Sequence, residues 1–314
     1  MKVIITGSVA FDHIMSMPGR FKDHIMPDKI HMLNVSFLMN KLRREKGGTG
    51  GNMAYGLGLL RVKSKLIASV GADFELEYRA HLESVGVDTS QIKVCKDLVS
   101  ATGFVMTDRD DNQIWGFFEG AMKQAIRLTL KKLVNEDELV VIGPNDPKAM
   151  AKYVTECSSF GYLFLFDPAF QIPNLPVEEL RLGVNKARVL IGNDYEIILM
   201  LKKTGLKKSQ LLKKDKILIT TLGSSGSLIE TNDKKLKIPV VKPKNISDPT
   251  GAGDAYRSGF VTGYINNLPL AVCGRIGALA AVYTVEEYGT QTHKFSLSEF
   301  KKRYKENFGE SLDL

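Results

Sequence analysis

The chain has 314 residues, of which 44% are hydrophobic and 25% are charged, a composition typical of a globular protein with a full-sized core. The 43 Lys and Arg residues outnumber the 35 Asp and Glu residues, which gives a formal net charge of +8. Because the basic residues are scattered in short groups, we expect no nucleic-acid partner. No stretch of the sequence approaches the roughly 20 apolar residues of a membrane span, so we expect no membrane partner.

The cysteines and histidines show no metal-binding or disulfide pattern. Cys95, Cys157 and Cys273 are widely separated and lack C-x-x-C spacing, and the five histidines lack helical pairing. The first residues contain no extended apolar segment followed by a cleavage site. We therefore expect a protein of the reducing cytoplasm.

Short β-branched runs alternate with helical stretches along most of the chain, which predicts a mainly parallel sheet flanked by helices. The predicted strands are residues 3–6, 66–70, 139–142, 162–166, 189–191 and 216–221. The predicted helices are residues 52–60, 73–84, 147–160, 194–203, 251–265 and 270–286.

Two segments interrupt this rhythm. Residues 11–46 are Met-rich and lack a clear helix, and residues 101–118 read as a hairpin with strands 102–107 and 113–118. Such a long structureless loop is improbable in a compact domain, so we expect a small β lid. An irregular edge subdomain is the alternative. The predicted division is an α/β domain of residues 1–12, 47–99 and 123–314, and a lid of residues 13–46 and 100–122.

Candidate sugar-binding groups follow the first predicted strand and begin the first predicted helix. Asp12 would lie at the carboxyl edge of a parallel sheet, where ligands bind, and could accept two ribose hydroxyl protons. The run Gly47 to Ala54 allows close backbone approach, and Asn52 supplies an amide that can donate to and accept from vicinal hydroxyls. A turn aspartate is the alternative for Asp12. No Gly-Lys-Ser/Thr follows the glycines, so this is not a Walker A loop.

Two later loops could contact a nucleotide. Asn193 can cap a helix with Glu196 in its first turn, an ordinary capping pattern, or the pair could hold Mg²⁺ through water. Residues 220–226 end a predicted strand in glycines and hydroxyls suited to triphosphate contacts, although a hairpin turn would look the same.

The most informative segment is residues 248–260, which places a carboxylate directly after glycine-rich backbone that opens a helix. The amides of Gly251, Ala252 and Gly253 are unsatisfied N-terminal donors and attract an anion. An unpaired carboxylate is an unfavourable neighbour for a bound phosphate unless it takes part in the reaction. We therefore interpret Asp254 as a general base that takes a proton from an attacking hydroxyl. A simple turn with a helix cap is the alternative.

These motifs, in this order, resemble the ribokinase-like (PfkB) carbohydrate and nucleoside kinase family, whose two signatures look like residues 47–54 and 248–260. The resemblance spans nearly the whole chain. Within the family, the chain looks most like the bacterial adenosine kinases, through residues 18–21, 33–38, 143–147, 193–196 and 288–291. It implies a three-layer α/β/α fold with a mainly parallel sheet and a small β-sheet lid. It also implies transfer of the γ-phosphoryl group of ATP to the 5′-hydroxyl of adenosine.

The resemblance also implies residue roles. Asp254 would be the base, and Gly251, Ala252 and Gly253 the anion hole. ATP would touch Asn193, Thr221, Gly223 and Gly226, with Mg²⁺ held by Asn193 and Glu196 through water. A monovalent cation such as K⁺ would use Asp248 and Thr250. The ribose would be held by Asp12, Gly48 and Asn52, and the base by Phe104 and Phe117, with further contacts from Ser8, Ser36 and Gln171.

One departure from the adenosine kinases bears on the acceptor. After Asp167-Pro168 the subgroup often carries polar residues, whereas this chain has Phe170, which removes a potential hydrogen bond. Inosine, guanosine, cytidine or a ribose- or fructose-type sugar are therefore alternatives to adenosine, and a catalytically silent nucleoside-binding regulatory protein is the alternative of another class. The apolar lid residues suggest a homodimer.

Overall fold

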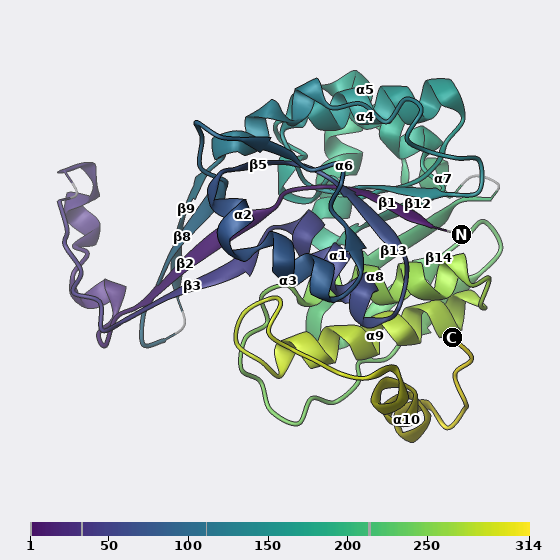
Figure 1. Cartoon of the computed structure of the whole chain (residues 1–314). Helices are drawn as coiled ribbons and strands as arrows, with labels where there is room; N and C mark the ends of the chain where they lie inside the picture. Colours follow the sequence, from purple (N-terminus) through teal and green to yellow (C-terminus); the bar gives the residue numbers. More distant parts are fainter. Residues whose placement is uncertain (1, 33, 111, 213–214) are drawn as a thin grey trace.

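The computed structural model describes residues 2–32, 34–110, 112–212 and 215–314. Its largest element is a nine-stranded sheet in the order β15-β14-β13-β12-β11-β10-β1-β4-β6 (Figure 1). The strands are parallel except that β14 runs antiparallel to both β13 and β15. Their bounds are β1 Val3–Thr6, β4 Ser64–Ile67, β6 Val87–Asp88, β10 Leu139–Ile142, β11 Leu163–Phe166, β12 Val189–Asn193, β13 Ile217–Thr221, β14 Ser227–Glu230 and β15 Lys235–Ile238.

Helices cover both faces of this sheet, so its strands are buried on both sides. In β1, Val3 and Ile5 point into one core and Ile4 points into the other. One core is closed by α1 Thr49–Leu59, α2 Asp73–Glu77, α3 Arg79–Ser84, α8 Ala252–Ile265, α9 Leu270–Val285 and α10 Leu297–Phe308. The other is closed by the 3-10 helix η3 Gly120–Arg127 and by α4 Pro147–Phe160, α5 Val177–Lys186, α6 Asp194–Thr204 and α7 Lys208–Leu211. The predicted three-layer α/β/α architecture is confirmed.

A small four-stranded sheet projects from the edge of the main body (Figure 1). Its order is β3-β2-β8-β9, with β2 parallel to β8 and the other pairs antiparallel. The bounds are β2 Ala10–Ser16, β3 Lys41–Gly47, β8 Ala101–Thr107 and β9 Gln113–Phe118. Two 3-10 helices, η1 Phe21–Asp23 and η2 Pro27–Met32, lie beyond its outer end, and β5 Ser69–Gly71 pairs with β7 Lys93–Cys95 elsewhere.

Three predicted elements differ from the observed ones. Residues 11–46 hold most of β2 and β3, which were not predicted as strands, because β3 is a charged edge strand without apolar alternation. The predicted strand 66–70 is divided between β4 and β5, which belong to different sheets. The predicted helix 73–84 is divided at Tyr78 into α2 and α3.

The remaining features are quickly stated. Two further 3-10 helices, η4 Ala169–Gln171 and η5 Gly223–Ser225, follow β11 and β13. All three cysteines are free. Among the described residues, no helix combines the length and the apolar character needed to cross a membrane.

Candidate active site

The N-terminus of α8 is formed by a turn that only glycine suits. Gly251 has φ +78°, and a Cβ there would lie 2.8 Å from Cγ2 of Thr290. The amide of Ala252 donates to the Pro249 carbonyl oxygen at 3.2 Å. The amides of Gly253 and Asp254 have no hydrogen-bond partner among the described residues. The helix therefore presents free donors and its positive end to an anion, with Ala252 contributing less than the sequence predicted.

Asp254 lies in the first turn of α8, where the Nδ2 atom of Asn52 donates to its Oδ2 atom at 2.8 Å. Burial raises the pKa of Asp254 to about 6, while the guanidinium of Arg257 and the hydrogen bond from Asn52 lower it. A carboxylate with such a pKa is ionised at neutral pH and more basic than an exposed aspartate, which suits a general base.

Asn52 is 8% exposed, and both ends of its side-chain amide are engaged by the protein. Its Oδ1 atom accepts from Oγ1 of Thr290 and from Nε2 of Gln291, each at 2.8 Å. The sequence assigned Asn52 to ribose hydroxyls, whereas here its hydrogen bonds reach Asp254 and the segment after α9. Thr290 and Gln291 were noted in the sequence without a role.

Ser8 and Gly48 build the loop that carries α1. The Oγ atom of the buried Ser8 accepts from the amide of Thr49 at 3.1 Å. Gly48 has φ +84°, and a Cβ there would lie 2.7 Å from the Ser8 carbonyl oxygen. Ser8, through its hydroxyl, and Gly48, through its backbone conformation, therefore shape the loop before α1.

A buried ion pair between Arg257 and Asp167 lies beneath the first turn of α8. Arg257 Nη2 donates to Asp167 Oδ1 at 2.9 Å, and a Cβ on Gly253 would lie 2.8 Å from Arg257 Nη1. The Nη1 end of the guanidinium thus lies close to the turn in which the helix amides are free. Sequence reasoning missed both residues, although Arg257 is a charged residue inside the buried run of residues 255–263.

A cleft of about 700 Å³ lies between one face of the small sheet and two loops of the main body. The carboxylate of Asp12 has no hydrogen-bond partner among the described residues, and burial, Glu45 and Asp248 raise its pKa to about 6. A Cβ on Gly47 or Gly103 would collide with its carboxylate, so glycines make room for it. The other lining residues include Ile14, Arg43, Val105, Gln113, Trp115, Ile246, Asp248, Pro249, Thr250, Tyr288 and Thr290.

A second cavity, of about 410 Å³ and largely apolar, lies on the other side of the same turn. It is lined by Thr221, Gly223 and Gly226 from the predicted nucleotide loop, and by Gly253 from α8. Ile246 and Pro249 line both cavities. The remaining lining residues include Val240, Pro243, Ala252, Tyr256, Ala278, Ala281, Val282 and Val285. The N-terminus of α8 therefore lies between two spaces, one polar and one apolar.

The predicted aromatic sandwich is not formed within one chain. In the strand register Phe117 lies opposite Gly103, which lies opposite Asp12, so Phe117 is on the cleft face. Phe104 lies opposite His13 and points to the outer face, where it stacks on the His13 ring at 5.2 Å. Trp115 shares the face of Phe117 and lines the cleft. Sequence reasoning missed it.

Two predicted nucleoside contacts also lie away from the cleft. Gln171 is buried, and its amide donates to the Asn145 carbonyl oxygen and accepts from Asn174 Nδ2, each at 2.9 Å. Ser36 is exposed in the segment between η2 and β3, beyond the outer end of the small sheet. Neither lines the cleft.

The predicted cation ligands take part in backbone capping. Asn193 and Glu196 form a reciprocal capping box at α6, and burial raises the pKa of Glu196, as does Asp167. Asp248 accepts from the amides of Thr250 at 2.9 Å and Gly289 at 3.2 Å. The described residues contain no group of three His, Cys, Asp or Glu side chains placed to hold a metal ion directly. A single carboxylate such as Glu196 still fits Mg²⁺ held through its own waters.

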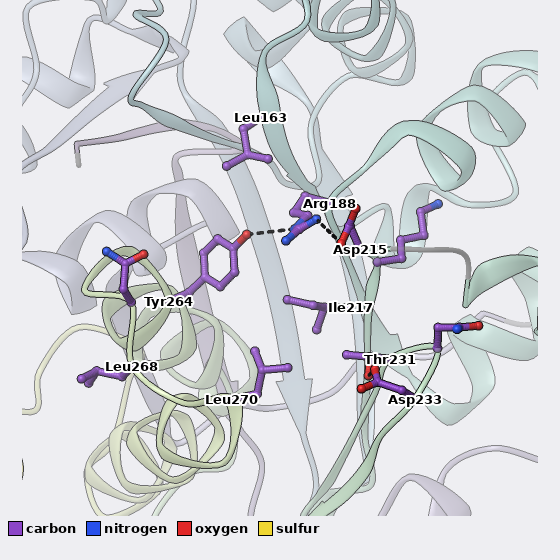
Figure 2. Close-up of a pocket in the computed structure, with 12 residues that line it drawn as sticks. Leu163, Arg188, Asp215, Ile217, Thr231, Asp233, Tyr264, Leu268 and Leu270 are labelled. Atoms are coloured by element: carbon purple, nitrogen blue, oxygen red, sulfur yellow. Dashed lines mark hydrogen bonds and ion pairs between the residues drawn. The ribbon is translucent and has the colours of Figure 1, made fainter.

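A third cavity, of about 500 Å³, opens at the amino ends of β11 to β13 and contains none of the predicted site residues (Figure 2). Arg188 Nε donates to the Tyr264 hydroxyl at 3.2 Å and lies near Asp215 (Figure 2). Since ligands of open α/β sheets bind at the carboxyl ends of the strands, we place the candidate site at the first two cavities.

Comparisons with known proteins show the family of the chain. The model of the pfkB family of carbohydrate kinases matches residues 7–295. A nucleoside kinase of Methanocaldococcus jannaschii is 32% identical over 296 residues, which cover 93% of each chain. A structure of a Burkholderia thailandensis nucleoside kinase in complex with inosine has a TM-score of 0.89 and 32% identity, over 98% of this chain and 99% of that one. The same kinase with ADP-inosine gives a TM-score of 0.87 and 34% identity, over 98% and 97%.

Proposed function

Because the chain belongs to the pfkB family of carbohydrate kinases, we propose that it transfers the γ-phosphoryl group of ATP to the 5′-hydroxyl of a nucleoside. One observation carries this proposal: the turn of residues 248–253 separates an apolar cavity from a cleft containing a free carboxylate. An adenine ring suits the first space, and ribose hydroxyls suit the second. The γ-phosphoryl group would then pass from the first space to the second at the N-terminus of α8.

The chemistry follows from the charges at that point. Asp254 removes the proton of the 5′-hydroxyl, and the oxygen attacks the γ-phosphorus in line with the departing ADP oxygen. The free amides of Gly253 and Asp254, with Arg257 beneath them, stabilise the charge on the phosphoryl oxygens. Asp12 accepts hydrogen bonds from the ribose hydroxyls. Closure of the small sheet over the cleft excludes water.

Two cations complete the proposal. Glu196 would hold Mg²⁺ through water near the phosphates, and bound Mg²⁺ neutralises phosphate charge. K⁺ would lie near the Asp248 turn, where Asp248 and Thr250 already fix the backbone before α8. A metal-free preparation assayed with Mg²⁺ and then with K⁺ or Na⁺ tests each cation separately.

The acceptor base is the finer part of the proposal. Phe117 and Trp115 supply aromatic surface on the cleft face, which favours a nucleoside over a free ribose- or fructose-type sugar. Adenosine was expected from the sequence. Inosine enters as the second candidate because the similar Burkholderia kinase binds it. Guanosine and cytidine would use the same aromatic surface.

We also propose that two copies associate through the outer face of the small sheet. Leu42, Phe104, Ile114 and Phe118 are exposed there, at 65%, 46%, 37% and 57%. By register all four lie on the face opposite Asp12. An apolar patch of this kind on a monomer marks an interaction surface.

The function is tested by measuring ADP release from Mg-ATP against adenosine, inosine, guanosine, cytidine, ribose and fructose 6-phosphate. A nucleoside should stimulate ADP release far above the rate without acceptor. Stimulation by sugars alone would refute the nucleoside assignment. Tight nucleoside binding without ADP release would instead identify a regulatory binding protein.

A further inference from the structure

The amide of Asn52 could face Asp254 in two ways, and only one of them supplies a hydrogen bond. With Nδ2 toward the carboxylate, as observed at 2.8 Å, Asn52 donates. Turned by 180°, it would present Oδ1 to a carboxylate oxygen, and the two acceptors would repel each other. Something in the protein must therefore fix the orientation of this amide.

The groups around Oδ1 of Asn52 show what fixes it. Gln291 Nε2 and Thr290 Oγ1 both lie at 2.8 Å from that atom. The Thr290 hydroxyl carries one proton and also lies 2.8 Å from the carbonyl oxygen of Lys46. It can therefore donate to only one of these two acceptors at a time. The Nε2 atom of Gln291 can only donate. It would be replaced by an acceptor at this place only if the Gln291 amide itself rotated by 180°.

Gln291 is held in turn by a buried tyrosine. Its Nε2 atom also donates to the hydroxyl of Tyr78, which donates to the carbonyl oxygen of Gly47 at 2.8 Å. Tyr78 is fully buried and Gln291 is 4% exposed, so water does not compete for these bonds. Both protons of the Gln291 amide are thereby directed, one to Asn52 and one to Tyr78.

We propose that Gln291 is a positioning residue for phosphoryl transfer: it holds Asn52 in the orientation that donates to the general base Asp254. The inference rests on the proposed function for the role of Asp254 as base. Gln291 itself touches neither the carboxylate nor either cavity.

The first test needs no catalysis. The side-chain carboxyl of Asp254 is titrated by ¹³C NMR in the ligand-free protein, with Asp254→Asn to assign its signal. Because the hydrogen bond from Asn52 lowers the pKa of Asp254, Gln291→Met should raise it. Arg257, which lowers this pKa, and Asp167 and Asp12, which raise it, are unchanged in the variant. An identical titration in wild type and Gln291→Met would overturn the proposal.

The second test is a double-mutant cycle on turnover with Asn52→Ala and Gln291→Met. Alone, Gln291→Met should lower kcat by up to about 10²-fold with nucleoside affinity changed less than about twofold. In the Asn52→Ala background it should have no further effect on kcat, because the amide it holds is gone. Additive losses would show that Gln291 acts independently of Asn52 and would overturn the proposal.

A matched control separates positioning from stability. Tyr55→Phe removes another buried hydrogen bond, from the Tyr55 hydroxyl to the His293 carbonyl oxygen at 2.8 Å, without touching Asn52. It should lower Tm and leave kcat unchanged. If Gln291→Met does not fold, Gln291→Asn, one methylene shorter, removes the same contact and is expected to give the same titration shift. A wild-type protein without nucleoside turnover would refute the proposed function, while the titration would still decide the role of Gln291.

Discussion

Asp254 is the residue on which the proposed reaction depends most. Asp254→Asn keeps the size of the side chain and removes its basicity, so kcat should fall roughly 10²- to 10⁴-fold, the usual contribution of a general base. Nucleoside affinity should stay nearly constant, because in the proposed complex Asp12 holds the ribose. Steady-state kinetics with titration calorimetry measure both, and full turnover in this variant would remove Asp254 from the mechanism.

The raised pKa of Asp254 predicts the acid side of the pH profile. The carboxylate must be ionised to act as a base, and its pKa is raised from 3.8 to about 6. Turnover should therefore be constant above this value and fall about tenfold per pH unit below it. Asp12 has a similar pKa and the two carboxylates repel each other. The midpoint of the pH profile therefore reflects the titration of both carboxyls together. A midpoint near 4 would contradict the burial of both groups.

Residue types and local order made much of the site predictable, whereas the partners of each residue did not. The sequence placed Asp254 directly after free helix amides, and the structure agrees. It could not show that Asn52 contacts Gln291, because 239 positions separate them. It likewise gave no sign that Arg257 pairs with Asp167 beneath α8. Such contacts depend on how helices pack, which local pattern does not encode.

At the scale of elements, the register of the small sheet decides which aromatic residues face the nucleoside. Trp115→Ala removes a ring from the cleft face and should weaken nucleoside binding about tenfold. Phe104→Ala is the matched control from the outer face of the same sheet and should change the affinity less than about twofold. Titration calorimetry on both variants compares the faces, and a larger effect of Phe104→Ala would reverse the assignment.

The turn before α8 gives a second prediction at this scale. Gly251→Ala places a Cβ at φ +78° against Thr290, so the free energy of unfolding should fall by about 1–2 kcal/mol, and kcat should fall with it. Gly205→Ala is the control, since Gly205 has φ +68° and open space around it. Denaturant unfolding and kinetics should show similar destabilisation but unchanged turnover in the control. Equal turnover in both variants would separate this turn from catalysis.

Element boundaries illustrate the limits of local sequence patterns. The helix predicted at residues 251–265 is α8 Ala252–Ile265, because glycines and an apolar face mark it clearly. The hairpin of residues 101–118 was predicted with both of its strands, but the face that it turns toward the cleft depends on how β8 pairs with β2. That register places Phe104 and Phe117 on opposite faces. The aromatic sandwich was therefore predicted wrongly for a single chain.

At the scale of the whole molecule, the exposed outer face of the small sheet predicts self-association. Leu42→Asp places a charge on the β3 side of this apolar face and should convert a dimer to a monomer in sedimentation velocity. Leu76→Asp, at a residue of α2 that is 82% exposed outside the patch, should leave the mass unchanged. A wild-type chain that sediments as a monomer at all concentrations would refute the proposed dimer.

The overall architecture was predictable because it repeats one simple rule. Buried β-branched strands alternating with helices indicate a parallel sheet, and the order of the two glycine-rich signatures indicated the family. The small sheet was predicted from an irregular stretch and a hairpin, but its strands β2 and β3 were not, since the charged sequence of β3 lacks a strand pattern. Its place over the cleft follows only from tertiary structure.

The most direct test of the central claim is the ³¹P NMR spectrum of the product formed from Mg-ATP and a nucleoside. Transfer across the N-terminus of α8 to the 5′-hydroxyl predicts a nucleoside monophosphate whose phosphorus signal is split into a triplet by two protons on C5′. The signal should form with wild type and almost vanish with Asp254→Asn. A doublet, which marks phosphorylation of a 2′- or 3′-hydroxyl, or release of inorganic phosphate alone, would contradict the account.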